Sequence, residues 1–327
     1  MKLLVIGDRA RVEKYLPALE VTEQVERVVV ARGTSDEDMF EAASDADFVL
    51  ADAISPVSAA LIDHMPKLRL IHSEGVAYNA IDLAAARRRG IPVCNCKGVN
   101  AGAVAEQAVL LMLAVLRDVL GGDRAVRQGR QIQTKERMMT EGIRELGDCK
   151  IGFLGAGDIA SATMARLAAW GCEMAYYKRT PLTDEQERRL GARFEPLETM
   201  LATSDIVSLH VPVTDETQGM VDEGFLKAMC AGGILINTAR GEIVDQEALA
   251  AALVSGHLAA AGLDTLYPEP VAADHPLLGL PDGASERIVF SPHVGGITEG
   301  TFYRAHRSIW ENIARAIVGE PLRNVVS

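Results

Sequence analysis

The chain has 327 residues, enough for two domains of ordinary size, and 48% of them are hydrophobic, which argues against a disordered protein. Its formal net charge of −12 argues against a nucleic-acid-binding protein, because such proteins are more often basic. The most apolar run after the N-terminus, residues 109–116, is far shorter than the ~20 residues of a membrane-spanning helix, so we expect no membrane contact.

Five cysteines occur at irregular spacing. The one close pair, Cys94 and Cys96, has no second pair or histidine cluster near it, so the sequence predicts no metal site. Reduced and mostly buried thiols are typical of a reducing compartment. We therefore expect a cytoplasmic protein.

The first hundred residues alternate short apolar runs with polar, helix-like segments. Strands are expected at residues 3–6, 28–30, 48–50, 68–71 and 92–94, and helices at 36–43, 58–65 and 81–89. This alternation predicts a parallel sheet covered by helices on both faces.

Residues 100–128 predict one long helix that breaks at the glycine pair 121–122, and residues 129–149 predict an irregular surface segment. The strand–helix alternation then resumes. Strands are expected at residues 151–154, 173–177, 206–209, 234–237, 261–264 and 288–291, and a last helix at 298–318. Two α/β units joined by long helices fit this pattern and the length of the chain.

A glycine turn follows the strand expected at 151–154. Gly155 allows the turn, Gly157 lets the backbone approach a pyrophosphate, and Ala160 lets the next helix pack closely on the strand. Asp158 and Ile159 begin that helix, whose free N–H groups and partial positive charge favour phosphates. The segment predicts a dinucleotide site.

The next strand ends in Lys178, Arg179 and Thr180, where NAD-binding proteins usually carry an acidic residue for the ribose hydroxyls. No carboxylate follows until Asp184. Arginine and threonine suit a 2′-phosphate, so we expect a preference for NADP(H), with NAD(H) possible. The alternative is that these are ordinary exposed loop charges.

Three polar residues follow successive expected strands further along the chain. Arg240 can hold a carboxylate and polarise a carbonyl, and His293 paired with Glu269 can transfer a proton to a carbonyl oxygen. Each residue alone would be unremarkable on a surface. Together, beyond the carboxyl ends of neighbouring parallel strands, they predict an active site.

The chain resembles the D-isomer-specific 2-hydroxyacid dehydrogenases over nearly its whole length. The motifs that carry the resemblance are Gly155-Ala-Gly157-Asp-Ile-Ala160, His210-Val-Pro212, Asn237-Thr-Ala-Arg240-Gly241, Gly262-Leu-Asp264 with Glu269-Pro270, and Ser291-Pro292-His293. The resemblance implies that Arg240 binds the substrate carboxylate and carbonyl, that His293 is the acid/base, and that Glu269 pairs with it.

The resemblance also implies further contacts. Asp264 would hold the nicotinamide carboxamide, and the cofactor would be lined by His210, Pro212, Thr217, Thr238, Ala239, His293 and Gly295. Backbone N–H groups near Gly75, Val76 and Ala77 would grip the substrate carboxylate, although residue 77 is usually glycine in the family, and Asn100 would lie near the substrate.

In this family a Rossmann nucleotide domain is inserted into a flavodoxin-like substrate domain. The resemblance thus implies an NADP(H)-binding domain at residues 101–294, a substrate domain at 1–100 plus 295–327, closure of the two domains, and a homodimer. The implied activity is reduction of a small 2-keto acid to the D-2-hydroxy acid, as in glyoxylate or hydroxypyruvate reductases. The alternatives are a cofactor-sensing, corepressor-like interaction protein of the same fold and a relative that oxidises formate or phosphite.

Overall fold

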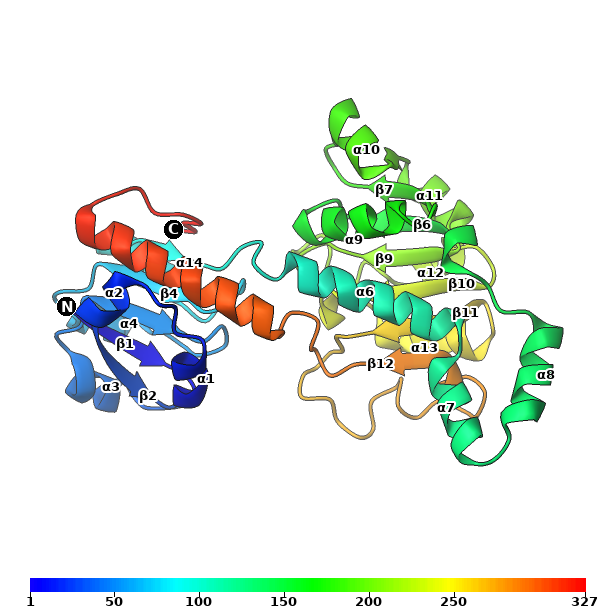
Figure 1. The fold of residues 1–327 in the computed structure, drawn as a ribbon, viewed down its shortest axis with the longest axis horizontal. Helices are drawn as coiled ribbons and strands as arrows, with labels where there is room; N and C mark the ends of the chain where they lie inside the picture. The colour runs from blue at the N-terminus through cyan, green and yellow to red at the C-terminus, as the bar shows by residue number, and fades with distance from the viewer. The chain divides into compact units, whose positions relative to one another are not determined.

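The computed structural model describes all 327 residues, which divide into two compact units. The first unit comprises residues 1–100 and 297–327, and the second comprises residues 101–296. In Figure 1 the first unit carries the blue and cyan N-terminal elements together with the orange-red helix α14 from the end of the chain. The chain therefore leaves the first unit once and returns to it.

The first unit is built around a five-stranded parallel sheet with the order β2-β1-β3-β4-β5. This is the flavodoxin-like order. Its strands are β1 (Lys2–Ile6), β2 (Glu26–Val30), β3 (Phe48–Ala51), β4 (Leu70–Ser73) and β5 (Val93–Cys94), and its helices are α1 (Arg9–Lys14), α2 (Glu20–Gln24), α3 (Asp36–Ala43), α4 (Ala59–His64), α5 (Leu83–Arg88) and α14 (Glu299–Val318).

Strand β1 shows how this sheet buries both faces. Leu3 and Val5 pack with α1, α2 and α14 around Trp310, whereas Leu4 and Ile6 pack with α3, α4 and α5. Successive side chains of a strand point to opposite faces, so a continuous apolar run is what a sheet covered on both sides requires.

The second unit contains a seven-stranded parallel sheet with the order β12-β11-β10-β9-β6-β7-β8. Its strands are β6 (Lys150–Leu154), β7 (Glu173–Tyr177), β8 (Ala192–Phe194), β9 (Ile206–Leu209), β10 (Gly233–Asn237), β11 (Leu258–Leu263) and β12 (Ile288–Phe290). Its helices are α6 (Ala101–Leu116), α7 (Val119–Arg127), α8 (Gln131–Glu141), α9 (Asp158–Ala168), α10 (Asp184–Leu190), α11 (Leu197–Thr203), α12 (Glu223–Ala228) and α13 (Gln246–Val254). Read from β8, the strands follow the Rossmann order and add one strand at the far edge.

Helices α6 and α9 pack on one face of the second sheet, and α11, α12 and α13 pack on the other. The order in which successive strands are added to the sheet reverses between β6 and β9, which pair in parallel although five elements (α9, β7, α10, β8 and α11) separate them in the chain. Figure 1 shows these two strands side by side in the sheet. Ligands of open α/β sheets bind beyond the carboxyl ends of the strands at such a point. The two doubly wound parallel sheets confirm the predicted fold class.

Two local predictions were wrong. The expected helix over 100–128 breaks at Asp118, not at Gly121 and Gly122, which lie inside α7. Asp118 has a φ of 43°, and a Cβ atom at position 121 would lie 2.3 Å from its Oδ1, so the glycine makes room for the Asp118 side chain. The irregular segment expected after residue 128 contains the 11-residue helix α8, which buries none of its residues.

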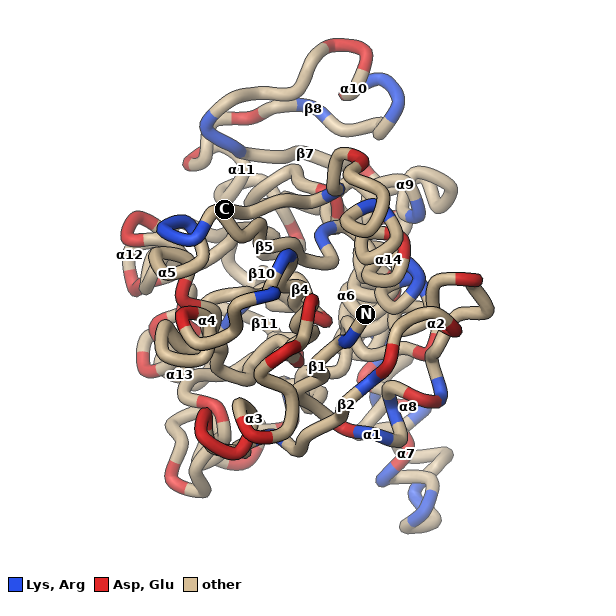
Figure 2. The backbone as a smooth tube through the Cα atoms, turned by 90° about the vertical axis from the view of Figure 1, so that its left-hand side faces the viewer, with Lys and Arg blue, Asp and Glu red and all other residues tan.

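The net charge of −12 reflects 45 acidic against 33 basic residues, and some of the acidic ones lie on exposed helices. In α3 of the first unit, Figure 2 shows a group of them, and the first turn of this helix contains Asp36, Glu37 and Asp38. Carboxylates in a first turn interact favourably with the helix dipole. No helix in the chain combines the length and the apolar character needed to cross a bilayer.

Candidate active site

The glycine turn after β6 is shaped by contacts that only glycine permits. Gly155 has a φ of 100°, and a Cβ atom there would lie 2.5 Å from the carbonyl oxygen of His210. At Gly157, which caps α9, an added Cβ would meet no protein atom within 4 Å. The backbone at Gly157 is therefore open to a ligand, and the first N–H groups of α9, at Asp158 and Ile159, lack partners inside the helix.

Lys178, Arg179 and Thr180 follow β7, as predicted. Neither of the two basic side chains forms an ion pair or a hydrogen bond within the chain, and Arg179 and Thr180 are exposed. The neighbouring Glu187 is already engaged, since its Oε1 accepts a hydrogen bond of 2.6 Å from the Tyr176 hydroxyl. The end of β7 thus offers positive charge that no carboxylate pairs with directly, although Glu216 lies close enough to interact with Arg179 electrostatically.

The segment after β9 holds His210, Pro212 and Thr217. The His210 ring stacks on Phe153 at 5.6 Å, its Nε2 lies 2.9 Å from the Ser208 hydroxyl, and loss of solvent lowers its pKa to about 4. The Thr217 hydroxyl donates to the carbonyl of Pro212 at 2.6 Å, so this side chain closes the loop. His210 is consequently neutral at physiological pH.

Beyond β10 the chain bends at Ala239, and Arg240 follows in an extended conformation. Asn237 closes the turn by donating from Nδ2 to the Arg240 carbonyl at 2.8 Å and accepting at Oδ1 from the Ala239 N–H at 2.9 Å. The Arg240 guanidinium forms no ion pair and donates only to the Ala239 carbonyl, at 2.7 Å. The Thr238 hydroxyl is buried and has no partner in the protein. The turn leaves a cation and a hydroxyl available for ligands.

His293 and Glu269 meet beyond β11 and β12. The Nδ1 atom of His293 lies 2.9 Å from Oε2 and 3.0 Å from Oε1 of Glu269. The pair is open to solvent, with side chains 44% and 43% exposed. Because Nδ1 faces the carboxylate, Nε2 remains free to exchange a proton with a bound molecule.

The loop that carries His293 is fastened by Asp264, which is 3% exposed. Its Oδ1 accepts from the Val294 N–H at 3.0 Å, its Oδ2 from the Gly295 N–H at 2.8 Å, and its carbonyl from the His293 N–H at 2.8 Å. The φ of His293 is 55°, a conformation that non-glycine residues adopt only where neighbouring contacts impose it. Asp264 supplies those contacts.

A cleft of about 490 Å³ lies next to His293. Apart from the polar residues already described, it is lined mainly by apolar side chains, which are Leu266, Val271, Leu278, Phe290 and Pro292. A larger polar groove of about 790 Å³ lies beside α1 and α2 of the first unit, but no residue predicted for the site lines it. Of the three residues predicted to be catalytic, Glu269 and His293 line this cleft and Arg240 does not.

In the first unit, the loop after β4 holds its carbonyl groups inward. The Gly75 carbonyl accepts from the Cys96 N–H at 2.9 Å, that of Val76 from Asn95 Nδ2 at 2.7 Å, and that of Ala77 from the Ser73 hydroxyl at 2.6 Å. The N–H groups of Val76 and Ala77 donate to no acceptor in the protein, whereas that of Gly75 donates to Ser73 Oγ at 3.2 Å.

Two free N–H groups on a loop fastened by its carbonyls form a suitable site for an anion. Asn100, the last residue before α6, has a partly buried side chain that makes no hydrogen bond within the protein.

Two sets of supporting residues were not predicted from the sequence. Gln107 donates from Nε2 to Ser291 Oγ at 2.9 Å, which supports the loop of His293. Glu74, directly before the carboxylate loop, is bound by Arg11 and His306. The sequence signal that could have indicated this cluster is Glu74 itself, an acidic residue that directly follows a buried strand.

The fold and these side chains together define a Rossmann-type oxidoreductase, with a glycine turn for a dinucleotide and a His–Glu pair for proton transfer. Residues 109–295 match the family model described as D-isomer specific 2-hydroxyacid dehydrogenase, NAD binding domain. The chain is 37% identical to a glyoxylate reductase of Korarchaeum cryptofilum over 88% of its own length and 85% of the relative's. It is 34% identical to a glyoxylate reductase of Pyrococcus furiosus over 97% and 92% of the two lengths.

Solved structures agree with these matches. The D-mandelate dehydrogenase of Rhodotorula graminis is 27% identical and superimposes with a TM-score of 0.85, covering 100% of this chain and 97% of the other. The chain belongs to the family of D-isomer specific 2-hydroxyacid dehydrogenases. It is thus an oxidoreductase that acts on CH–OH donors with a nicotinamide cofactor, and nothing supports the corepressor-like alternative.

Proposed function

We propose that this chain is an NADP(H)-preferring reductase that converts small 2-keto acids, glyoxylate and hydroxypyruvate among them, into D-2-hydroxy acids. The observation that carries the proposal is the His293–Glu269 pair, with Nδ1 held at 2.9 Å and Nε2 free beside a cleft. The uncommitted Arg240 guanidinium lies after β10, the strand next to β11 in the same sheet. The names of the relatives in Korarchaeum and Pyrococcus support glyoxylate as a substrate.

The proposed roles follow from what each group can do. Arg240 would bind the substrate carboxylate and polarise the keto oxygen, and His293 Nε2 would donate a proton to that oxygen while Glu269 stabilises the charged ring. When bound, the cofactor supplies the hydride that forms the new C–H bond at the keto carbon. The second unit would hold the cofactor, and the first unit would bind the substrate carboxylate through Gly75, Val76 and Ala77.

The residues present fit a nicotinamide dinucleotide phosphate. The open backbone at Gly157 suits the pyrophosphate, and the unpartnered Thr238 hydroxyl can bond to a ligand beside it. Lys178 and Arg179 are unpaired where the adenosine ribose of a Rossmann domain lies, so they favour a 2′-phosphate. Asp264 would still accept from the nicotinamide carboxamide through the second lone pair of Oδ2, because only Oδ1 already accepts two hydrogen bonds, from Ser291 Oγ and the Val294 N–H.

We also propose a homodimer in which a second copy covers α7 and α8. These helices expose apolar side chains, including Ile132 at 57% and Met139 at 74%. An exposed apolar surface of this kind indicates an interface between chains. All five cysteines are free thiols, which supports the expected reducing, cytoplasmic environment.

The function is tested by steady-state kinetics with glyoxylate, hydroxypyruvate, pyruvate and a branched 2-keto acid, each with NADPH and with NADH. We expect the highest kcat/KM for a small keto acid with NADPH, and loss of several powers of ten in kcat for Arg240→Ala and His293→Ala with little change in cofactor binding. Failure of the wild-type enzyme to reduce any of these acids, or near-normal turnover in either variant, contradicts the proposal.

A further inference from the structure

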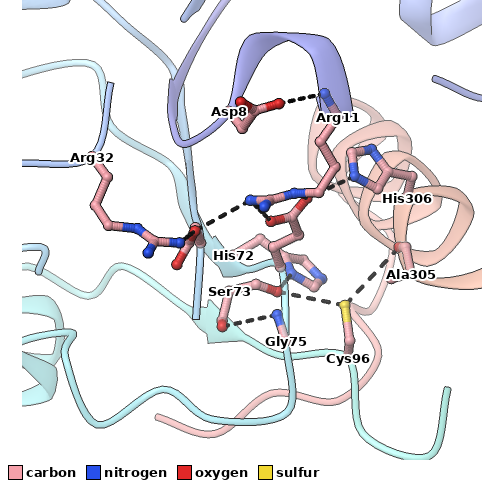
Figure 3. A network of polar contacts seen from close by, with 11 residues as sticks. Asp8, Arg11, Arg32, His72, Ser73, Gly75, Cys96, Ala305 and His306 are labelled. Atoms are coloured by element: carbon pink, nitrogen blue, oxygen red, sulfur yellow. Dashed lines mark hydrogen bonds and ion pairs between the residues drawn. The ribbon is translucent and has the colours of Figure 1, made fainter. Parts of the chain in front are cut away.

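A buried ion cluster lies directly behind the loop proposed to bind the substrate carboxylate. Glu74 is 8% exposed, and its carboxylate accepts hydrogen bonds from Arg11 Nε at 3.1 Å, Arg11 Nη2 at 2.6 Å and His306 Nε2 at 2.9 Å. Figure 3 shows Arg11 from α1 and His306 from α14 converging on the end of β4, next to Gly75. Three elements far apart in the sequence therefore meet at one carboxylate.

The charges in this cluster balance. Arg11 Nη2 also contacts Asp52 Oδ2 at 3.2 Å, and Arg32 bonds to the same carboxylate from the solvent side. Two arginines thus face two carboxylates. Burial alone raises the pKa of the Glu74 carboxyl, but the hydrogen bonds from His306 and Arg11 outweigh it and hold this pKa below its usual value. Glu74 is therefore an anion at neutral pH.

This anion sits one residue before an anion-binding loop, where it would oppose the binding of a negatively charged substrate. The nearby free N–H groups of Val76 and Ala77 attract a carboxylate, whereas an unbalanced Glu74 would repel it through a poorly solvated region. Hydrogen-bond donors of Arg11 and His306 surround the Glu74 carboxylate and offset its charge. His306 is fully buried, and its Nδ1 has no partner, so it contributes through the single Nε2–H···Oε1 bond.

We propose that Arg11 is a positioning residue for the reaction: by neutralising Glu74 through two hydrogen bonds, it keeps the loop of residues 75–77 able to bind an anionic substrate. Glu74 in turn fastens the start of that loop to α1 and α14. The inference rests on the proposed function, because it takes this loop as the carboxylate site. It predicts that the charge of Arg11, rather than its volume, determines substrate affinity.

The test compares Arg11→Met, Arg11→Lys and the double variant Arg11→Met/Glu74→Gln. The readouts are kcat, the KM values for glyoxylate and NADPH, and the dissociation constant of oxamate, a carboxylate that cannot accept hydride, measured by calorimetry with NADPH present. We expect Arg11→Met to weaken glyoxylate and oxamate binding about tenfold or more, since an unbalanced charge then lies near the bound anion. We expect Arg11→Lys to stay within about threefold of wild type, and the double variant to recover most of the loss, because both restore neutrality.

The matched control is Arg9→Met, which removes an exposed arginine from the same helix α1 that contacts neither Glu74 nor Asp52, and it should leave substrate affinity unchanged. Equal impairment of the double variant and Arg11→Met, or equal changes in the KM for NADPH and for glyoxylate, would overturn the inference. If Arg11→Met fails to fold, Arg11→Gln takes its place, because it also removes the charge that balances Glu74, and the same tenfold or larger loss of glyoxylate and oxamate affinity is expected. Wild-type affinity in Arg11→Gln would overturn the inference. Absence of keto acid turnover in the wild type is a failure of the proposed function, whereas a fully active wild type with unaffected variants is a failure of this inference alone.

Discussion

The Oδ2 atom of Asp264 accepts the backbone N–H of Gly295 at 2.8 Å, and through this bond and its neighbour at Val294 a buried carboxylate fixes the loop that carries His293. The two residues lie in different segments, after β11 and after β12, and the parallel sheet brings them together. The resemblance assigned Asp264 to the cofactor, and the structure adds a support for the proposed acid/base.

We therefore expect Asp264→Asn to lower kcat by about ten- to a hundredfold, because an amide has one acceptor oxygen and would point an N–H group at a backbone N–H. The loop should loosen while the fold persists. Steady-state kinetics with NADPH and a 2-keto acid measure the effect. Asp282→Asn, on the exposed segment before β12, is the control and should behave as wild type. Unchanged kcat in Asp264→Asn would mean that the loop holds its conformation without the carboxylate.

Glu269→Gln separates charge from geometry in the proposed proton-transfer pair. Glutamine can still accept the Nδ1–H bond of His293, but it cannot stabilise a positive ring. We expect kcat to fall about ten- to a hundredfold, with the KM for NADPH unchanged. Glu286→Gln, which removes an exposed carboxylate elsewhere in the second unit, should have no effect. Wild-type turnover in Glu269→Gln would show that the pair only orients the ring.

The cofactor preference is expected to depend on the basic end of β7. Removing both charges, as Lys178→Ala/Arg179→Ala, should raise the KM for NADPH about tenfold or more and change that for NADH by less than about threefold, because only NADPH carries the 2′-phosphate. Arg189→Ala, an exposed arginine on α10 without an ion pair, is the control. Equal effects on the two cofactors would mean that these basic residues interact with the pyrophosphate, which both cofactors share, or only stabilise the loop.

The two glycines of the turn should respond differently to alanine. Gly155→Ala forces a Cβ atom to within 2.5 Å of the His210 carbonyl at a φ of 100°, so we expect a loss of stability of about 1–3 kcal/mol. Gly157→Ala meets no protein atom and should fold normally while losing cofactor affinity, since the methyl group would occupy the place of the pyrophosphate. Urea unfolding and NADPH titration by fluorescence distinguish the two. Tight NADPH binding by Gly157→Ala would contradict the dinucleotide turn.

His72 makes the stability of the first unit depend on pH. Burial lowers its pKa from 6.5 to about 4, and its Nε2 accepts a hydrogen bond from Asn312 Nδ2 at 3.2 Å. Between these two values the unfolded chain binds a proton that the folded chain does not, so stability falls as the pH drops through this window. The loss should approach roughly 3 kcal/mol at pH 4.

Urea unfolding between pH 7 and pH 4 measures this effect, with Trp310 as the fluorescent probe of the first unit after Trp170→Phe removes the other tryptophan. A His72→Gln variant cannot bind the proton in either state, so it should lose less stability than the parent over the same range. Parallel pH dependences of the two proteins would show that His72 is not the group responsible.

Much of the fold was accessible from the sequence because strands buried on both faces must be continuously apolar. Runs such as Leu3–Ile6 and Ile206–Leu209 are short, apolar and followed by polar turns, and each is a strand within a residue or so of the expected position. Strand β8 was missed, since three residues at a sheet edge with an exposed Arg193 leave no apolar run to detect. The predicted position of the helix break before α7 was wrong. Nothing in the sequence indicates that Asp118 adopts a left-handed conformation, whereas a glycine pair is a common signal for the end of a helix.

The sequence by itself determined the two α/β units, the glycine turn and the motifs of the 2-hydroxyacid dehydrogenase family, because these depend on local runs of residues that must pack or turn in one way. Only the tertiary structure decided how side chains from distant segments are joined. The contact of Glu74 with Arg11 and His306 spans 63 and 232 residues of chain, and no periodicity reports it. Such pairings depend on where parallel strands end in space. Beyond the ends of β11 and β12, Asp264 supports the loop of His293. At the end of β4, a balanced ion cluster lies behind the loop proposed to bind the substrate carboxylate.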